Sequence, residues 1–233
     1  MSSSCRCPLS ARVAVSRQRH DHRFAEVRER HRHQTSFGEL TLRGSAGRHT
    51  WIVGTAVERD VYAPRDVPQF AYVFTVPGVF VQDDVDVADW LAVSASGRFD
   101  HHSEYGAFFS PRLSALLRTG GWTARLSAGT GFFGPSILTE ETEAAGLSRL
   151  IVPRALRAER GRSASVDLTR ADGPASITLT LFASRVLNPI KVDRSNGFVL
   201  TNQPEAATNT GIEVQRWNLP TSERHPVSSP SIV

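Results

Sequence analysis

The sequence predicts an all-β fold: an antiparallel transmembrane β-barrel segment of about ten long strands, which would form an open curled sheet if the barrel is incomplete. Three observations support this prediction. Apolar and polar side chains alternate with a period of two in six segments, as in strands with two unlike faces. The connections between these segments alternate between short turns and long excursions. Tryptophan gathers at one end of the strands and phenylalanine at the other.

The alternating segments are spread along the chain, and helical spacing fits none of them as well as a period of two. In the segment that begins at Trp122, residues Ala124 and Leu126 share one face, whereas Thr123 and Arg125 share the other. In chain order the six segments are 9–16, 91–100, 110–118, 122–128, 162–170 and 175–184.

The connections are of two kinds, which places the short turns at one end of the sheet. The short turns are expected at 45–47, 86–89, 119–121 and 171–174, and the long loops at 19–36, 60–69, 100–109 and 133–160. Transmembrane barrels combine short turns on one side with long loops on the other. A soluble sandwich distributes its long loops more evenly between its two ends. The pattern has one exception, a short turn at 194–197 on the long-loop side.

The aromatic residues predict two girdles at a lipid–water boundary, where such rings are enriched. From Trp122 to Phe132 is ten steps, about 33 Å of strand, or about 25 Å of height at a tilt of about 40°. That height matches the apolar band of a barrel, so outer-membrane lipid is a predicted partner. Core aromatic residues of a soluble sheet are the alternative. The girdle residues are Trp51, Trp90, Trp122, Trp217, Phe99, Phe132 and Phe133.

Composition and charge restrict the remaining classes. The 233 residues are 40% hydrophobic and 21% charged, as in ordinary folded chains, and no apolar run is long enough for a transmembrane helix. The net charge of +4 comes without any nucleic-acid-binding motif, so no nucleic-acid partner is predicted. We expect a disordered stub at 1–8, the barrel region at 9–217 and a disordered tail at 218–233. Cys5 and Cys7 fall in the stub, and no apolar signal-peptide core precedes the barrel region.

Several stretches resemble TonB-dependent outer-membrane receptors. VFVQDD at 79–84 resembles their YAQDE strand, and GRFD at 97–100 with SPRLS at 110–114 resembles their GLRYD and SPRLS pair. LSAGTGFFGPS at 126–136 is similar to ASYGRGFRAPS, and ERGRS at 159–163 to PERSRS. TLFASRV at 180–186 resembles TLFRSRID, and Asn202 with GIE at 211–213 resembles their N and GVE.

The resemblance runs from about Leu9 to Trp217 and covers the middle-to-late part of the family's barrel. The chain is therefore expected to be a truncated receptor barrel, without signal peptide, TonB box or plug. The resemblance implies an outer-membrane location and uptake of a scarce extracellular small ligand, such as a ferric siderophore or cobalamin. It implies no enzyme activity, no cofactor and, without a plug, no contact with TonB.

Two other hypotheses remain open at this point. A small complete outer-membrane pore or adhesion barrel would pair its first strand with its last. A soluble β-sandwich binding module would cover the apolar face of the sheet with a second layer.

Histidines in two of the expected long loops are the candidate ligand contacts. His-x-His spacing could place imidazoles for a metal, and neighbouring arginines could attract an anionic ferric chelate. The commoner outcome for such a loop is a solvated, partly helical segment, and no metal is predicted. A short helix is expected from Thr139 to Glu143. No catalytic residue is predicted, because no hydrolase, metalloprotease or P-loop motif is present. The candidates are His20, His22, His31, His33, His101 and His102.

Overall fold

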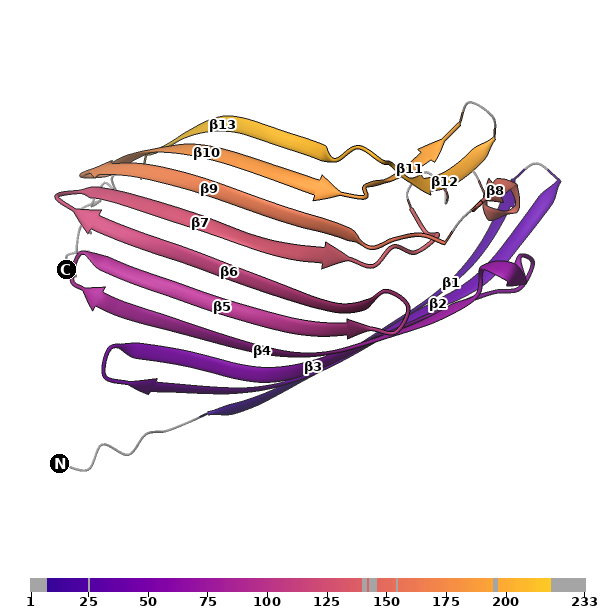
Figure 1. The fold of residues 1–233 in the computed structure, drawn as a ribbon, viewed down its shortest axis with the longest axis horizontal. Coiled ribbons are helices and arrows are strands. Elements are labelled where there is room, and N and C mark those ends of the chain that lie inside the picture. Colours follow the sequence, from indigo (N-terminus) through magenta and orange to yellow (C-terminus); the bar gives the residue numbers. More distant parts are fainter. Residues whose placement is uncertain are drawn as a thin grey trace, which may run out of the picture.

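The computed structural model describes residues 8–24, 26–139, 142, 146–153, 155–194 and 197–218. Its main element is a ten-stranded antiparallel sheet, which confirms the predicted all-β class and strand number (Figure 1). Among the described residues, no helix has the length and apolarity needed to cross a membrane. The strands of this sheet, in spatial order, are β1 (Leu9–Phe24), β2 (Val27–Ala46), β3 (His49–Pro64), β4 (Tyr72–Ala88), β5 (Leu91–His102), β6 (Gly106–Thr119), β7 (Trp122–Phe133), β9 (Glu159–Asp172), β10 (Ala175–Leu187) and β13 (Ala207–Asn218).

The sheet is open. Strand β1 pairs only with β2 and strand β13 only with β10 within the part of the chain that the structure describes, so these two strands form opposite edges. A complete small barrel would require β1 to pair with β13. The open sheet does not favour that alternative and agrees with an incomplete barrel.

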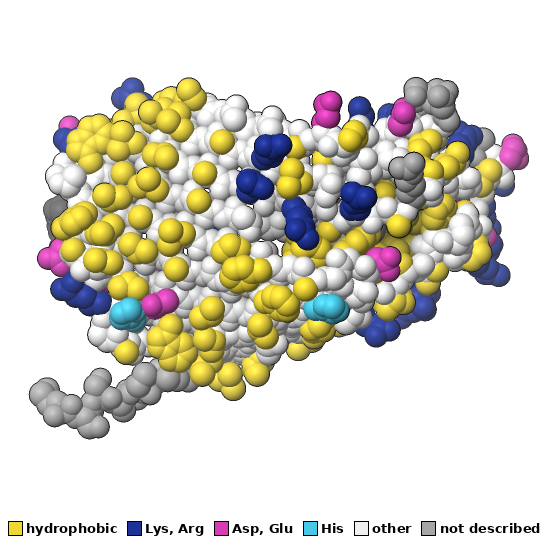
Figure 2. Space-filling model, in the orientation of Figure 1, with side chains coloured by type: hydrophobic (Ala, Val, Ile, Leu, Met, Phe, Trp, Pro, Cys, Tyr) yellow, Lys and Arg dark blue, Asp and Glu magenta, His cyan; other side chains and the backbone are white. Residues whose placement is uncertain are grey.

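One face of the sheet is apolar and bare. The register places one apolar row across six strands, and every member has its cross-strand neighbour on the same face. The exposed fraction is 45% for Leu126 and 72% for Ile212, and no other described element covers this row, so the second layer of a β-sandwich is not favoured. Figure 2 shows apolar side chains gathered over the tight-turn half of the visible face. The row consists of Val93, Ala115, Leu126, Val166, Leu181 and Ile212.

The opposite face is polar. Arg98, Arg112, Arg125 and Asp167 alternate with the apolar rows, as strand geometry requires. Cavities open along this face, and one of about 420 Å³ is lined by Gln82, Asp84, Arg112, Ser114, Arg125 and Ser127.

Two of the predicted long loops are wrong, because strands run through them. Strands β1 and β2 continue to Phe24 and from Val27, so most of 19–36 is paired backbone. Strands β5 and β6 are joined by only three residues between His102 and Gly106. The predicted loop at 60–69 is also shortened, since β3 runs to Pro64. Beyond the apolar rows the strands carry polar residues on both sides, so they lose the apolar signal.

One predicted long loop, 133–160, does remain, and together with the connection between β10 and β13 it folds into a small second sheet that the sequence did not predict. Strands β11 (Ile190–Asp193), β12 (Phe198–Asn202) and β8 (Leu150–Ile151) form it, preceded by the 3-10 turn η2 (Leu147–Arg149). A second 3-10 turn, η1 (Pro68–Phe70), follows β3. The expected helix at 139–143 and the termini at 1–7 and 219–233 lie largely outside the described residues.

The fully buried core of the chain lies at this second sheet. Leu200 has no exposed surface, and it packs in one cluster with Leu147, Leu150 and Val192 and with Tyr62 of β3. The far ends of β1 and β2 lie beside β8 in Figure 1. The core therefore joins the first strands of the chain to connections that come much later in the sequence.

Candidate functional site

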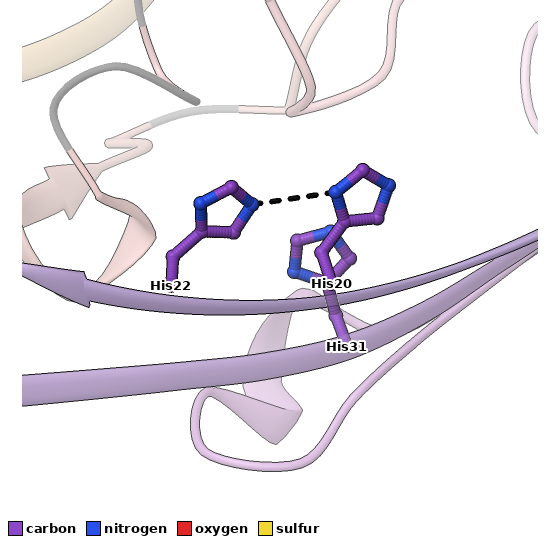
Figure 3. Close-up of side chains that lie close together, drawn as sticks. All are labelled: His20, His22 and His31. Atoms are coloured by element: carbon purple, nitrogen blue, oxygen red, sulfur yellow. Dashed lines mark hydrogen bonds between the residues drawn. The ribbon is translucent and has the colours of Figure 1, made fainter.

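Three of the candidate histidines meet on one face of the β1–β2 hairpin. His20 and His22 are two residues apart on β1, so they point to the same side, and His20 lies directly opposite His31 of β2. Figure 3 shows the three rings side by side. Their ring centroids are 4.8 to 5.8 Å apart, with interplanar angles of 12 to 20°.

The nitrogen atoms of these rings are close. One ring nitrogen from each of His20, His22 and His31 lies within 4.8 Å of the other two. His22 Nε2 is 3.3 Å from His20 Nδ1, and His20 Nε2 is 3.2 Å from Gln18 Oε1. His22 is exposed, whereas His20 and His31 are half-buried.

His33 occupies a separate polar cluster on the same face. Its Nε2 lies 2.6 Å from Asp60 Oδ1, and Tyr72 donates its hydroxyl to Asp60 Oδ2 at 3.1 Å. Thr35 donates more weakly to Asp60 Oδ1, at 3.4 Å. Asp60 therefore contacts three side chains, two from β2 and one from β4, which fixes the His33 ring.

A row of ring contacts connects the histidine clusters across the sheet. Tyr62 contacts His31 at 5.2 Å and Tyr72 at 5.5 Å between ring centroids. Phe74 continues the row, at 4.3 Å from Tyr72 and 4.9 Å from His102. Rings from β1 to β5 thus form a continuous aromatic surface on the polar face, which the sequence did not reveal.

The row ends in the turn after β5. Tyr105 lies 4.7 Å from His102 between centroids and donates its hydroxyl to the Pro135 carbonyl at 2.6 Å. Burial raises the pKa of Tyr105 to about 12. The structure separates the neighbouring pair His101 and His102, because successive strand residues point to opposite faces.

A cavity of about 320 Å³ lies beside this end of the row. Arg98 and Asp100 form an ion pair at its wall at 2.7 Å, and the Asp100 side chain is almost fully buried. The lining also includes Glu58, Asp60, Phe74, His102 and Phe133. It combines aromatic surface with charges of both signs.

The arginines near the histidines lie on the other face of the sheet. Arg19 and Arg23 alternate with His20 and His22 on β1, so their side chains leave from opposite sides. Two ion pairs hold this basic region: Arg28 with Asp21, and Arg30 with Asp66 at 2.7 Å. The guanidinium groups therefore do not line the imidazole cluster. A single loop that carried both residue types would have brought them to one place.

The proposed girdle residues occupy both ends of the sheet. Trp51, Trp90, Trp122 and Trp217 lie at or next to the tight-turn end, and Trp51 and Trp122 belong to the apolar face. At the other end Phe99 faces Phe109, which is 65% exposed. Phe132 stacks on Phe108, with 3.9 Å between the ring centroids, so it is not an isolated ring at the boundary. Phe133 lines the cavity beside Asp100.

Solved structures of similar fold come from siderophore and iron uptake. The siderophore receptor PirA from Pseudomonas aeruginosa aligns with a TM-score of 0.70 at 15% identity, covering 88% of this chain and 47% of that one. The FrpB iron transporter from Neisseria meningitidis aligns with a TM-score of 0.70 at 13% identity, covering 89% of this chain and 38% of that one. A mutant of the ferric enterobactin receptor (PfeA) from Pseudomonas aeruginosa, in complex with enterobactin, aligns with a TM-score of 0.64 at 16% identity. The alignment covers 81% of this chain and 34% of that one. The chain thus spans less than half the length of each.

At the level of sequence, no curated protein matches. The family model described as "TonB dependent receptor-like, beta-barrel" matches residues 13–223, which is most of the chain and nearly the whole ten-stranded sheet. This family is one of receptors, not of enzymes. The chain therefore belongs to the TonB-dependent receptor-like β-barrel family.

Proposed function

We propose that this chain is the barrel region of an outer-membrane receptor that takes up a scarce ligand such as a ferric siderophore or cobalamin. The division of the sheet into a bare apolar face and a polar face with cavities carries the proposal. A soluble protein rarely exposes so large an apolar surface. In lipid that surface would be favourably placed, and neighbouring strands would satisfy the backbone hydrogen bonds everywhere except at the outer edges of β1 and β13.

In this arrangement the apolar rows contact outer-membrane lipid between the tryptophan end and the row of Phe99 and Phe109. The tight turns lie on the periplasmic side, and the histidine-bearing end of the strands lies on the extracellular side. The polar face then lines the barrel interior. Charged residues such as Arg98 and Asp100 are stable there because they pair with each other, and the Arg98 side chain is also partly exposed to water.

The ligand contacts that we propose are on the polar face beyond the apolar rows. His33 and His102 border the aromatic row, and Asp60 and Arg98 add charge beside the cavity. Stacked rings and mixed charge suit a bulky aromatic or chelate ligand, which needs both surface contact and a few polar anchors. His101, on the other face, would contact the ligand only from outside the barrel. No contact with TonB is expected for the residues of this chain.

A binding measurement tests this proposal. The full chain, folded in detergent and reconstituted in lipid vesicles, is mixed with iron-labelled ferric enterobactin, and the label that sediments with the vesicles is counted. We expect saturable retention that falls at least tenfold for His102→Ala. His49→Ala is the control, since His49 pairs with Asp83 at the tight-turn end. Absence of retention, or equal loss in both variants, would contradict the proposed ligand site.

A further inference from the structure

We propose that His20, His22 and His31 form a binding site for a divalent transition-metal ion of the Zn²⁺ type. The His-x-His spacing alone supplies two imidazoles. The hairpin register adds the third, because His31 lies directly opposite His20. The site thus exists only once β1 and β2 have paired.

The nitrogen spacing is close to that of a coordinated metal. Zinc binds imidazole nitrogen at about 2.0–2.1 Å in tetrahedral geometry, which places two ligand nitrogens about 3.4 Å apart. His22 Nε2 and His20 Nδ1 already lie 3.3 Å apart. One nitrogen of each of the three rings lies within 4.8 Å of the other two, so small side-chain rotations bring the third imidazole to the ion.

Gln18 supplies the outer support that metal-binding histidines usually have. Its Oε1 lies 3.2 Å from His20 Nε2 and can only accept, so Nε2 carries the proton in this contact. The lone pair of His20 is then on Nδ1, which faces His22. The hydrogen bond thus selects the tautomer that a metal requires.

The ligand set selects the kind of ion. Three neutral imidazoles suit zinc, copper or nickel, whereas calcium and magnesium need oxygen ligands. The arginines nearest the histidines in sequence, Arg19, Arg23 and Arg32, leave from the opposite face, so the sheet separates their charge from the ion. Three imidazoles leave one position of a tetrahedral ion unfilled. Because His22 is exposed, water or a further ligand can reach that position.

The site lies on the edge strand β1 and its neighbour β2, beyond the apolar rows, where an ion can enter from water. It does not depend on the proposed uptake of a chelate. A chain that binds zinc here but retains no ferric enterobactin would support this site and contradict the proposed function. A chain that retains ferric enterobactin but binds no zinc would support the proposed function and contradict this site.

Calorimetric titration with Zn²⁺ tests the inference. The full chain is purified without a polyhistidine tag and carries Cys5→Ser and Cys7→Ser, which remove the thiolates as competing ligands. We expect one ion per chain, with affinity lowered at least tenfold by His22→Ala and by His31→Ala. His33→Ala is the matched control, on the same strand and face as His31 but paired with Asp60, and should bind zinc like the parent.

A second readout separates loss of ligand from loss of fold. Circular dichroism should show unchanged strand content in His22→Ala, whose exposed side chain supports no core. Co²⁺ should give the visible absorption of a tetrahedral site in the parent and not in the variant. Zinc binding that is absent in the parent, or that survives both histidine substitutions, would overturn the inference.

Discussion

The Glu29 carboxylate accepts a hydrogen bond from the backbone N–H of Leu147 at 2.8 Å, although 118 residues separate the two in sequence. Its second oxygen accepts from Ser148 at 2.7 Å. Glu29 is only 4% exposed, so these two bonds compensate for burying its charge. They tie the extended end of β2 to the segment that leads into β8.

Replacing Glu29 should loosen this junction. In Glu29→Ala the buried N–H of Leu147 and the part-buried N–H of Ser148 lose their acceptor, and we expect the free energy of local opening to fall by about 1–3 kcal/mol. Hydrogen exchange at the amides of Leu147 and Ser148 measures this change. Glu58→Ala serves as the control, because Glu58 is exposed on the neighbouring strand β3. Equal protection of both amides in the parent and Glu29→Ala would contradict the role of this contact.

Gly54 is required by the close approach of Phe80. A Cβ atom at position 54 would lie 2.3 Å from Phe80 Cζ and 2.7 Å from the Leu40 carbonyl oxygen, and backbone cannot easily move away. We expect Gly54→Ala to lower the free energy of unfolding by about 1–3 kcal/mol, from overpacking. The measurement is urea unfolding in detergent, followed by tryptophan fluorescence.

Gly131→Ala is the matched control for that substitution. Gly131 also lies within a strand, but no heavy atom lies within 4 Å of its added Cβ. Its effect should stay within about 0.5 kcal/mol. If the two glycine variants unfold at the same urea concentration, the crowding at Gly54 has no energetic consequence.

The Arg30–Asp66 contact should persist to low pH. The guanidinium and backbone N–H of Arg30 lower the pKa of the Asp66 carboxyl from its ordinary value of 3.8 to about 2. A depressed carboxyl pKa stabilises the folded state above pH 3.8, and this contribution is lost as pH falls through about 2. A carboxyl-carbon NMR titration of Asp66 measures the pKa directly. A midpoint at or above 3.8 would show that the pair does not hold in solution.

The sequence predicted much of the large sheet because apolar alternation marks six of its ten strands, each of which has one bare apolar face. It failed beyond the apolar rows, where His20 and His22 alternate with Arg19 and Arg23. That alternation has the same period of two, but both residue classes are polar, so it resembles a loop. Attention to the period, rather than to hydropathy, could have found this strand.

Other features depended on pairing between distant segments. The register that sets His31 opposite His20 follows from the position of the hairpin turn, which apolar patterns do not mark here. The row from Tyr62 to His102 comes from strands that are adjacent only in the folded sheet. The strands β8, β11 and β12 are too short for alternation to reveal, and their stability comes from the core around Leu200.

The proposed lipid face should reject charge more strongly than the polar face. Arginine at the midplane of the lipid-facing side of a barrel costs about 2–4 kcal/mol, and arginine facing the interior costs less. We therefore expect Leu126→Arg, on the apolar face, to reduce folding into lipid vesicles far more than Leu116→Arg, on the polar face of β6. Folding is measured by resistance to protease after reconstitution. Similar yields for the two variants would argue against a lipid-facing side.

The most direct measurement places single cysteines at two successive positions of β7. Leu126→Cys and Ser127→Cys are made in a chain that also carries Cys5→Ser and Cys7→Ser, reconstituted in lipid vesicles and treated with a water-soluble maleimide. Leu126 belongs to the apolar row, whereas Ser127 lines a cavity on the polar face. We expect Ser127→Cys to react and Leu126→Cys to react only after the vesicles are dissolved and the chain is denatured. Rapid labelling of both cysteines in intact vesicles would contradict the assignment of the apolar face to lipid.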